Sequence, residues 1–260
     1  MELKKKTDWE IDHLNGKVKS VHVFYFNKAD EKTLAINPLT ILKTDTSNHL
    51  IINYDADGNL TSHVMSNGRR VLISNFDTAH YMVVSTKFAA DGRVSYEDTS
   101  LYDENGYRVE TMEHIYVNDT LYYRASYNVD RKGNALEMDA TENNKFLYKW
   151  KYSYDESGNK IEEDQYYLYD SLMQKWVYQY DPDRNVIEKA KYIDSLVEKF
   201  DYKYDGHRNV IEELRYDSNS KLVEDITYKY VYDDKGNWIR KVTSGSKHDY
   251  PVTIRFIEYY

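Results

Sequence analysis

Apolar and polar residues alternate along most of the chain, and tyrosine-led turns separate the alternating stretches. In the stretch 151–163, Tyr152 and Tyr154 stand at alternate positions, so their side chains share one face of an extended strand. Asp155 then begins a turn, and Gly158 stands at its fourth position. Asp and Gly are favoured at these two places of a type I turn, and a left-handed Gly after such a turn is common in hairpins. The stretch predicts two antiparallel strands.

The same frame recurs every 24 to 28 residues, led by Tyr102, Tyr127, Tyr154, Tyr180, Tyr204 and Tyr232. A fixed period of roughly 20 to 50 residues is typical of a repeat protein. Most copies also carry an apolar residue two places after the turn Asn: Leu136, Ile161, Ile187, Ile211 and Ile239. Two copies have Arg184 and Arg208 where the others have Gly. We expect positive φ at both arginines, at a cost of about 1 kcal/mol each.

The ends of the chain differ from the repeats. Residues 18–26 alternate but are apolar on nearly both sides, which suits a strand that caps an array. Residues 34–42 contain Pro38 and are expected to form irregular structure or an edge strand. No window has a sustained 3.6-residue period, so the chain is predicted to be all-β. We predict one repeat domain over 1–260, with N-terminal capping strands (1–49), repeats (50–242) and a closing strand (243–260).

The Tyr-Asp-x-x-Gly-Asn units at 54–59, 154–159 and 232–237 resemble the YD repeats of RHS-type and teneurin proteins and of short repeat proteins of the Bacteroidetes. The resemblance covers roughly residues 50 to 240, and it implies an antiparallel β-repeat array without catalytic residues. The expected fold is an elongated antiparallel β-meander of YD-type hairpins, forming a thin or single-layer twisted sheet.

Composition supports a half-exposed sheet. The chain has 28 Tyr against 7 Phe, with 41% apolar and 30% charged residues. Tyrosine combines a large apolar body with a hydroxyl that prefers water or a partner. The net charge of −9 argues against a nucleic-acid partner, because phosphates demand a positive surface. The chain has no cysteine, which excludes disulfides, thiolate nucleophiles and Cys-type zinc sites.

We also expect no membrane span, because no stretch approaches the ~18 apolar residues that a spanning helix needs. The N-terminus lacks the apolar core of an export signal. The family resemblance favours the periplasm or cell surface for a protein whose leader has been removed.

Candidate reactive sites are weak. The run Asp55 to Asn59 begins like a calcium loop, but Leu60 and Ser66 stand where an EF-hand needs Gly and Glu, so we interpret it as turn chemistry. The eight histidines have no metal-ligand spacing, and no nucleophile elbow or phosphate loop is present. We therefore expect no metal, no cofactor and no enzymatic activity.

The tyrosine rows are the candidate binding feature. They comprise Tyr152, Tyr154, Tyr178, Tyr180, Tyr202, Tyr204, Tyr230 and Tyr232. Such rows stabilise a sheet through cross-strand pairs, by roughly 0.2 to 1 kcal/mol each. If they are exposed, they would form a platform for sugar rings or for a protein. The expected function is a non-catalytic interaction module of the bacterial cell envelope with a protein partner. A glycan-binding module is the alternative, and a hydrolase with two converging carboxylates is a third hypothesis.

Overall fold

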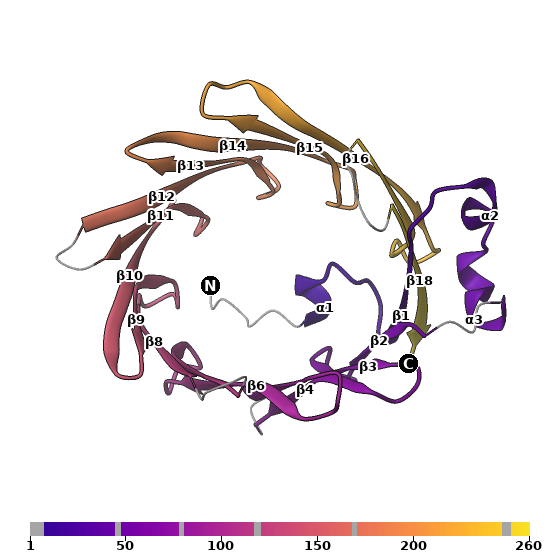
Figure 1. Ribbon diagram of the computed structural model, residues 1–260, viewed down its shortest axis with the longest axis horizontal. Helices are drawn as coiled ribbons and strands as arrows, with labels where there is room; N and C mark the ends of the chain where they lie inside the picture. The colour runs from indigo at the N-terminus through magenta and orange to yellow at the C-terminus, as the bar shows by residue number, and fades with distance from the viewer. Residues whose placement is uncertain (1–7, 45–47, 78–80, 117–120, 168–170, 246–250) are drawn as a thin grey trace.

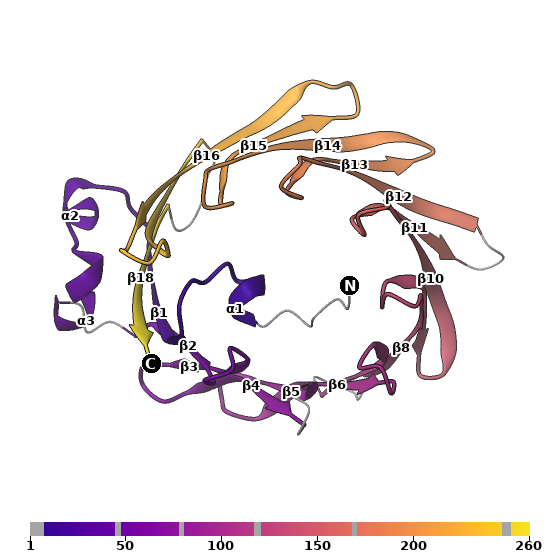
Figure 2. The ribbon, with the colours of Figure 1, turned by 180° about the vertical axis from the view of Figure 1, so that it is seen from behind.

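The computed structural model describes residues 8–44, 48–77, 81–116, 121–167, 171–245 and 251–260. Within them, 18 strands join into one antiparallel sheet. Figure 1 shows the sheet as a ring of strands around an open middle, and Figure 2 shows the same ring from behind. The described chain is therefore a β-barrel.

Four short helical segments precede or interrupt the strands: α1 (Asp8–Ile11), α2 (Glu31–Leu34), the 3₁₀ helix η1 (Pro38–Thr40) and α3 (Ile41–Thr44). The first nine strands are β1 (Val18–Phe26), β2 (Leu50–Tyr54), β3 (Leu60–Met65), β4 (Arg70–Phe76), β5 (Met82–Phe88), β6 (Val94–Tyr102), β7 (Arg108–Ile115), β8 (Leu121–Val129) and β9 (Ala135–Glu142). The other nine are β10 (Lys145–Tyr154), β11 (Lys160–Tyr167), β12 (Ser171–Tyr180), β13 (Val186–Ile193), β14 (Ser195–Tyr204), β15 (Val210–Asp217), β16 (Leu222–Tyr232), β17 (Trp238–Ser244) and β18 (Val252–Tyr259).

Strand β1 closes the barrel. Strands β2 to β18 pair in chain order, each antiparallel to the next. Strand β1 then pairs on one side with β18, with Val21 opposite Ile257, and on the other side with β2, with Val21 opposite Ile52. Because both sheet ends pair with the same strand, no edge strand remains in the ring.

The repeated turns share one set of hydrogen bonds. In the turn at 155–159, the Asp155 carboxylate accepts both the backbone N–H of Asn159 and its side-chain amide, each at 2.8 Å. The N–H of Gly158 donates to the Asp155 carbonyl at 3.0 Å. The same double clasp joins Asp55 to Asn59, Asp130 to Asn134, and Asp181 to Asn185. The frame recognised in the sequence is thus a self-contained hairpin loop.

A β-bulge accompanies each of these turns. Ser153 pairs with Glu162 but Tyr154 pairs with Lys160, so Ile161 is an extra residue on its strand. The equivalent extra residues are Leu136, Ile187, Ile211 and Ile239. The apolar residue two places after each turn Asn is therefore the bulge residue. Bulges bend a strand and increase its twist, and bending repeated around the sheet favours closure.

Both arginines that replace Gly in the turns adopt positive φ, 65° at Arg184 and 65° at Arg208. This confirms the prediction made from the turn alignment. Their N–H groups donate to the carbonyls of Asp181 and Asp205, each at 3.0 Å, as Gly158 does to Asp155.

The helical segments cover the two faces of β1. Inside the ring (Figure 1), α1 and the residues after it place Leu14 against Val18, Val21, Val23 and Tyr54. Outside the ring, Ile41 of α3 packs with Phe24, Val252 and Ile254. These two clusters hold the largest fully buried apolar side chains, so the core lies where the barrel closes. No helix in the described part of the chain is long and apolar enough to cross a membrane.

The expected fold class needs correction. The all-β prediction is confirmed, but the open, elongated array and the thin single-layer sheet are wrong, because the strands form a closed 18-stranded barrel. Residues 18–26 do form a strand, and both of its neighbours are ends of the same sheet, so it closes the barrel and does not cap an array. The division of the chain at 49 and 242 stays a prediction.

The expectation of an irregular or edge strand at 34–42 is also wrong. Asp30 caps α2 by accepting the Thr33 N–H at 2.9 Å, and Asn37 caps η1 by accepting the Leu39 N–H at 3.0 Å. Pro38 occupies the first turn of η1, where its missing N–H leaves no hydrogen bond unmade.

Candidate lumen site

The predicted tyrosine rows lie on the lumen face of the wall. In β18, Thr253 and Arg255 line a cavity together with Leu14, on the inner side where α1 lies. Across the sheet, Thr253 pairs with Lys241, and Lys241 pairs with Tyr230. Following the same register through the paired strands places the tyrosines of β10, β12, β14 and β16 on this inner face.

Four of these tyrosine hydroxyls connect one repeat to the one before it. Each donates to the backbone carbonyl of the residue that follows the turn Asn of the preceding repeat. The pairs are Tyr154 with Ala135 (2.9 Å), Tyr180 with Lys160 (2.7 Å), Tyr204 with Val186 (2.7 Å) and Tyr230 with Val210 (2.9 Å). These hydroxyls hold the wall together and are not free to bind a ligand.

Two further tyrosine hydroxyls bind acidic side chains. Tyr178 donates to Glu163 and Tyr232 donates to Asp205, and burial followed by these hydrogen bonds raises the pKa of both tyrosines. The ring of Tyr232 also stacks on His207, with centroids 4.1 Å apart. The rows therefore have a structural role, while a role of their ring faces in binding stays a prediction.

Cationic side chains lie over these inner rings. The Lys160 ammonium is 5.5 Å from the ring centroid of Tyr152 and 5.3 Å from that of Tyr178. Lys189 lies 5.1 Å from the Trp176 centroid and 4.7 Å from that of Phe200. Aromatic faces attract cations, so the inner wall combines aromatic rings with lysine ammonium groups at these positions.

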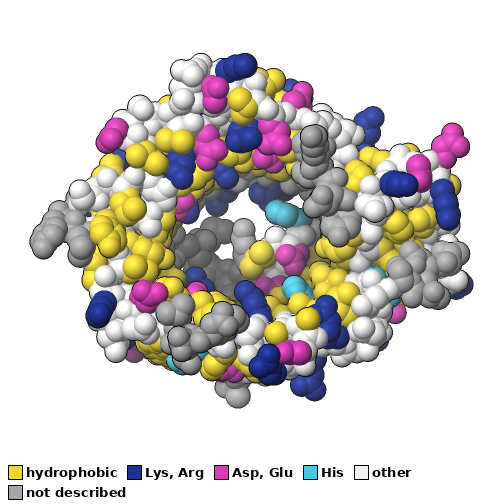
Figure 3. Space-filling model, in the orientation of Figure 1, with side chains coloured by type: hydrophobic (Ala, Val, Ile, Leu, Met, Phe, Trp, Pro, Cys, Tyr) yellow, Lys and Arg dark blue, Asp and Glu magenta, His cyan; other side chains and the backbone are white. Residues whose placement is uncertain are grey.

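A cavity of about 410 Å³ opens into the lumen where the barrel closes. The residues after α1 form one side of it, with Leu14 and His13, and the inner faces of β1 and β2 contribute Val21, Val23 and Ile52. Strands β17 and β18 form the other side: Trp238, Lys241, Thr253 and Arg255. We call it the seam cavity. Figure 3 shows the ring hollowed at its middle. The seam cavity has apolar side chains on one side and the cationic side chains of Lys241 and Arg255 on the other.

The seam cavity contains more cationic side chains than carboxylates. Asp12 accepts the hydroxyl of the buried Tyr54 at 2.7 Å, and burial together with Asp12 raises the pKa of Tyr54. Arg255 lies 3.8 Å over the Trp238 ring, and burial lowers the pKa of its guanidinium to about 10. Burial and the neighbouring Arg255 lower the pKa of Lys241. The cavity thus holds two cationic groups and one carboxylate.

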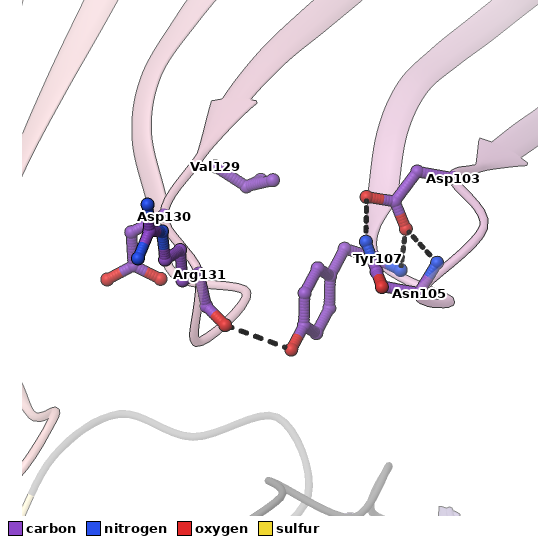
Figure 4. A pocket seen from close by; sticks show the side chains of 6 residues that line it. All are labelled: Asp103, Asn105, Tyr107, Val129, Asp130 and Arg131. Atoms are coloured by element: carbon purple, nitrogen blue, oxygen red, sulfur yellow. Dashed lines mark hydrogen bonds between the residues drawn. The ribbon is translucent and has the colours of Figure 1, made fainter.

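Smaller hollows lie between neighbouring turns. In the one shown in Figure 4, Tyr107 extends toward the next turn and donates its hydroxyl to the Arg131 carbonyl at 3.3 Å. Gly133 makes room for this ring, since a Cβ there would lie 2.5 Å from Tyr107. The hollow measures about 330 Å³, and its carboxylates Asp103 and Asp130 are engaged in their own turns.

The outer wall of β9 to β14 carries clusters of one lysine and two carboxylates. They are Lys149 with Glu137 and Asp139, Lys175 with Glu162 and Asp164, and Lys199 with Glu188 and Asp201, all within 3.0 to 3.8 Å. Carboxylates were the basis of the hydrolase hypothesis. In these clusters they are cross-strand partners of lysines, except Asp201, which lies on the same strand as Lys199. Exposed pairs of this kind typically contribute 0 to 1 kcal/mol each.

The calcium-like run is turn chemistry, as expected. The Asp55 carboxylate accepts the N–H groups of Asp57 and Asn59, both at 2.9 Å, and the Asn59 amide. Among the described residues, no group of three or more His, Asp or Glu is arranged to hold a metal ion.

Sequence reasoning found the tyrosine rows but missed the seam cavity. Arg255 alternates with Val252, Ile254 and Phe256, a pattern that normally places the charged residue in water. Nothing in the sequence shows that α1 lies across this face. The only signal was the apolar character of both faces of residues 18–26, which indicated cover on both sides.

Comparisons with known proteins give limited likeness. No family model matches the chain, and no curated protein matches it. A porin-like protein of Bacteroides uniformis is similar in structure, with 10% identity over 94% of this chain and 98% of that one and a TM-score of 0.48. A porin-like protein of Bacteroides vulgatus has 13% identity, the same coverage and a TM-score of 0.42. A structure described as TcdB2-TccC3-Cdc42 has 14% identity and a TM-score of 0.32, over 80% of this chain and 15% of that one.

The assignment to the YD-repeat family is wrong. No family model matches the chain, and the open repeat array that the assignment implied is instead a closed 18-stranded barrel. The turn motif recurs for a physical reason that does not depend on the family. Asp, Gly and Asn recur because they form a tight hairpin loop, and any antiparallel sheet with bulged hairpins can use that loop.

The expectation of no membrane span is also corrected. It was based on the absence of a long apolar stretch, which is a test for helices. This chain is a closed barrel of strands of 5 to 11 residues, and a test for long apolar helices does not apply to it. The expected protein or carbohydrate partner at the cell surface stays unidentified.

Proposed function

We propose that this chain is a non-catalytic binding barrel of the bacterial cell envelope that takes a small ligand into its lumen. The observation that carries the proposal is the seam cavity, about 410 Å³ in volume and open to the lumen. Ligand sites are concave, mostly apolar and carry a few polar groups, and volumes of roughly 300 to 1,000 Å³ are typical. The mouths of barrels are common places for them.

The chemistry of the cavity supports binding more than catalysis. Its lining has one carboxylate, Asp12, which already accepts a hydrogen bond from Tyr54. A glycosidase needs two facing carboxylates, and a nucleophile needs an adjacent base. The cavity offers apolar side chains and two cations, which can hold a ligand.

A glycan ligand is the second candidate, favoured by the aromatic rings on the inner wall. Trp150 and Tyr152 lie nearly parallel, at 6°, and so do Phe200 and Tyr202, at 7°. Flat rings with this alignment offer faces on which sugar rings can stack. Replacing Tyr178 and Tyr202 with Ala would weaken binding to a glycan array under this alternative, and an unchanged signal would remove it.

Single cysteines test entry into the lumen, because the chain has none of its own. Tyr25 lines the seam cavity and is 53% exposed, whereas Val231 lies outside the cavity lining and is 45% exposed. We expect both Tyr25→Cys and Val231→Cys to react with a small maleimide. A ligand found by thermal-shift screening of neutral, anionic and cationic solutes should protect position 25 and leave position 231 reactive.

Two results would contradict the proposal: no saturable binding of any solute in such a screen, or equal protection at both positions.

The location of the protein in the cell needs its own experiment. Fractionation of the native host separates cytosol, osmotically released proteins and detergent-extracted membranes, and recovery in the cytosol would overturn the envelope part of the proposal alone.

A further inference from the structure

The most unusual side chain in the lumen is that of Arg255. Its Nε atom is buried and has no hydrogen-bond partner among the described residues, and its guanidinium lies 3.8 Å over Trp238. No carboxylate of the described residues lies within ion-pair distance of it. A buried donor without a partner costs free energy, and a buried charge costs more, unless another group compensates it.

Lys241 lies beside it and repeats the pattern. It lines the same cavity, about 5.8 Å from the Trp238 ring, and no ion pair joins it to a described carboxylate. Lys160 is paired with Glu163, and Lys175 on the outer face has two carboxylates. Lys189 also has no ion pair with a described carboxylate, but it does not line the seam cavity. Two cations that form no ion pair with a described carboxylate therefore meet in one cavity of a chain whose net charge is −9.

We propose that the seam cavity binds a small organic monocarboxylate, whose carboxylate group is held by Arg255 and Lys241 and whose body packs against Val21 and Ile52. This inference names the ligand class of the proposed lumen function and depends on it. A guanidinium and an ammonium provide the charge-assisted donors that carboxylates accept.

Charge and size select this ligand class. The groups facing the two cations are Asp12, His13 and Tyr54 from the chain around α1 and β2, together with Tyr228 and Trp238 from β16 and β17. Outside the cavity lining, Tyr259 and Asp233 also act electrostatically on Arg255. Among the residues that line the cavity, two cations and the Asp12 carboxylate leave one positive charge, which a monoanion neutralises and a dianion exceeds. A volume of about 410 Å³ with apolar side chains opposite the cations suits a compact ring or branched body.

The test uses matched ligands on the whole chain. Cyclohexanecarboxylate is compared with cyclohexanemethanol, and glucuronate with glucose, by isothermal titration calorimetry at low ionic strength. We expect each carboxylate to bind at least ten-fold more tightly than its neutral counterpart. Inorganic phosphate is titrated as well, and we expect it to bind more weakly than the carboxylates.

Variants assign the effect to residues. We expect Arg255→Gln and Lys241→Met each to reduce carboxylate affinity roughly ten-fold or more and to leave the neutral compounds unchanged. Lys189→Met is the matched control, because Lys189 also lies over inner aromatic rings but outside the seam cavity. Asp12→Asn keeps an acceptor for Tyr54 and should increase carboxylate affinity; it covers the case in which Arg255→Gln does not fold.

The failures are distinguishable. If neutral sugars bind as tightly as acidic ones, or if the Lys241 and Asp12 variants leave carboxylate affinity unchanged, the carboxylate site is overturned and the lumen function survives. Preferential binding of phosphate overturns the monocarboxylate as the ligand. If no solute of any class binds, both proposals fall.

Discussion

Arg208 reaches back to Asn185, donating from Nε to the side-chain oxygen at 3.0 Å, while its terminal nitrogen donates to the Asp183 carbonyl at 3.1 Å. One turn thereby holds the preceding one. In this position the backbone of Arg208 is left-handed, with φ 65°, a conformation that favours glycine. Arg184 has the same φ, but its side chain makes no such hydrogen bond to a described residue.

The two arginines therefore predict opposite responses to glycine. Arg184→Gly should stabilise the fold by about 1 kcal/mol, because it removes backbone strain at a small cost in chain entropy. Arg208→Gly should be neutral or destabilising by up to ~1 kcal/mol, because the same relief is offset by two lost hydrogen bonds. Urea unfolding of both variants measures the difference, and equal gains would show that the Arg208 contacts contribute nothing.

We expect a loss of stability when the tyrosine hydroxyls that connect neighbouring repeats are removed. Tyr180→Phe and Tyr204→Phe keep the ring but leave the Lys160 and Val186 carbonyls without their donor, so each should cost about 1 kcal/mol. Tyr167→Phe is the control, because Tyr167 is 46% exposed and its hydroxyl has no hydrogen bond to another described residue. Thermal unfolding distinguishes the variants, and a loss at Tyr167 as large as at Tyr180 would contradict the structural role.

The turn carboxylates predict a loss of stability in acid. Hydrogen bonds from the backbone and side chain of Asn159 lower the pKa of Asp155 from its ordinary 3.8. The pKa of Asp181 is lowered in the same way, and the hydrogen bond from the Asn185 side chain is the largest cause. A carboxyl whose pKa is lower in the folded than in the unfolded chain stabilises the fold fully above the unfolded pKa. That stabilisation is lost as the pH falls through the folded pKa.

We therefore expect the free energy of unfolding to hold its turn contribution from pH 7 to about 5 and to decrease below about pH 4. Asp155→Asn should make the decrease shallower, since Asn cannot be protonated in this range. Glu156→Gln, one residue further in the same turn, is the control. Urea titrations at pH 7 and pH 3.5 give the free energy of unfolding of each protein. An identical decrease between the two pH values in all three proteins would contradict the assignment.

Barrel closure predicts a specific crosslink. Ser20 and Glu258 are opposite each other in β1 and β18, and the Ser20 hydroxyl donates to the Glu258 carboxylate at 2.6 Å. Facing residues of an antiparallel pair have Cα atoms roughly 4.5 to 5.5 Å apart, within the range that a disulfide needs. The double variant Ser20→Cys, Glu258→Cys should oxidise within one chain, as mass spectrometry of unreduced peptides would show.

The pair Ser20→Cys, Ser153→Cys is the control, because β1 does not pair with β10. An open array would leave residues 20 and 258 far apart. Free thiols, or crosslinks only between chains, in the first variant would therefore contradict closure.

Much of the local structure was determined by the sequence itself. The hairpins, the turn type and the positive φ of Arg184 and Arg208 follow from interactions within about ten residues: an Asp–Asn clasp, a left-handed fourth position and alternating side chains. The eight tyrosines could be placed on one face because the period of a strand is two. None of this depends on distant parts of the chain.

Closure, the lumen and the seam cavity were decided only by the tertiary structure. Local hairpin geometry is compatible with an open sheet or a ring. A ring forms because the bending of all strands adds up and because β1 pairs with both ends of the sheet, β18 and β2. Arg255 was not recognisable because its surroundings come from residues more than 200 positions away, such as Asp12 and Leu14. Contacts at that separation leave no periodic trace in the sequence.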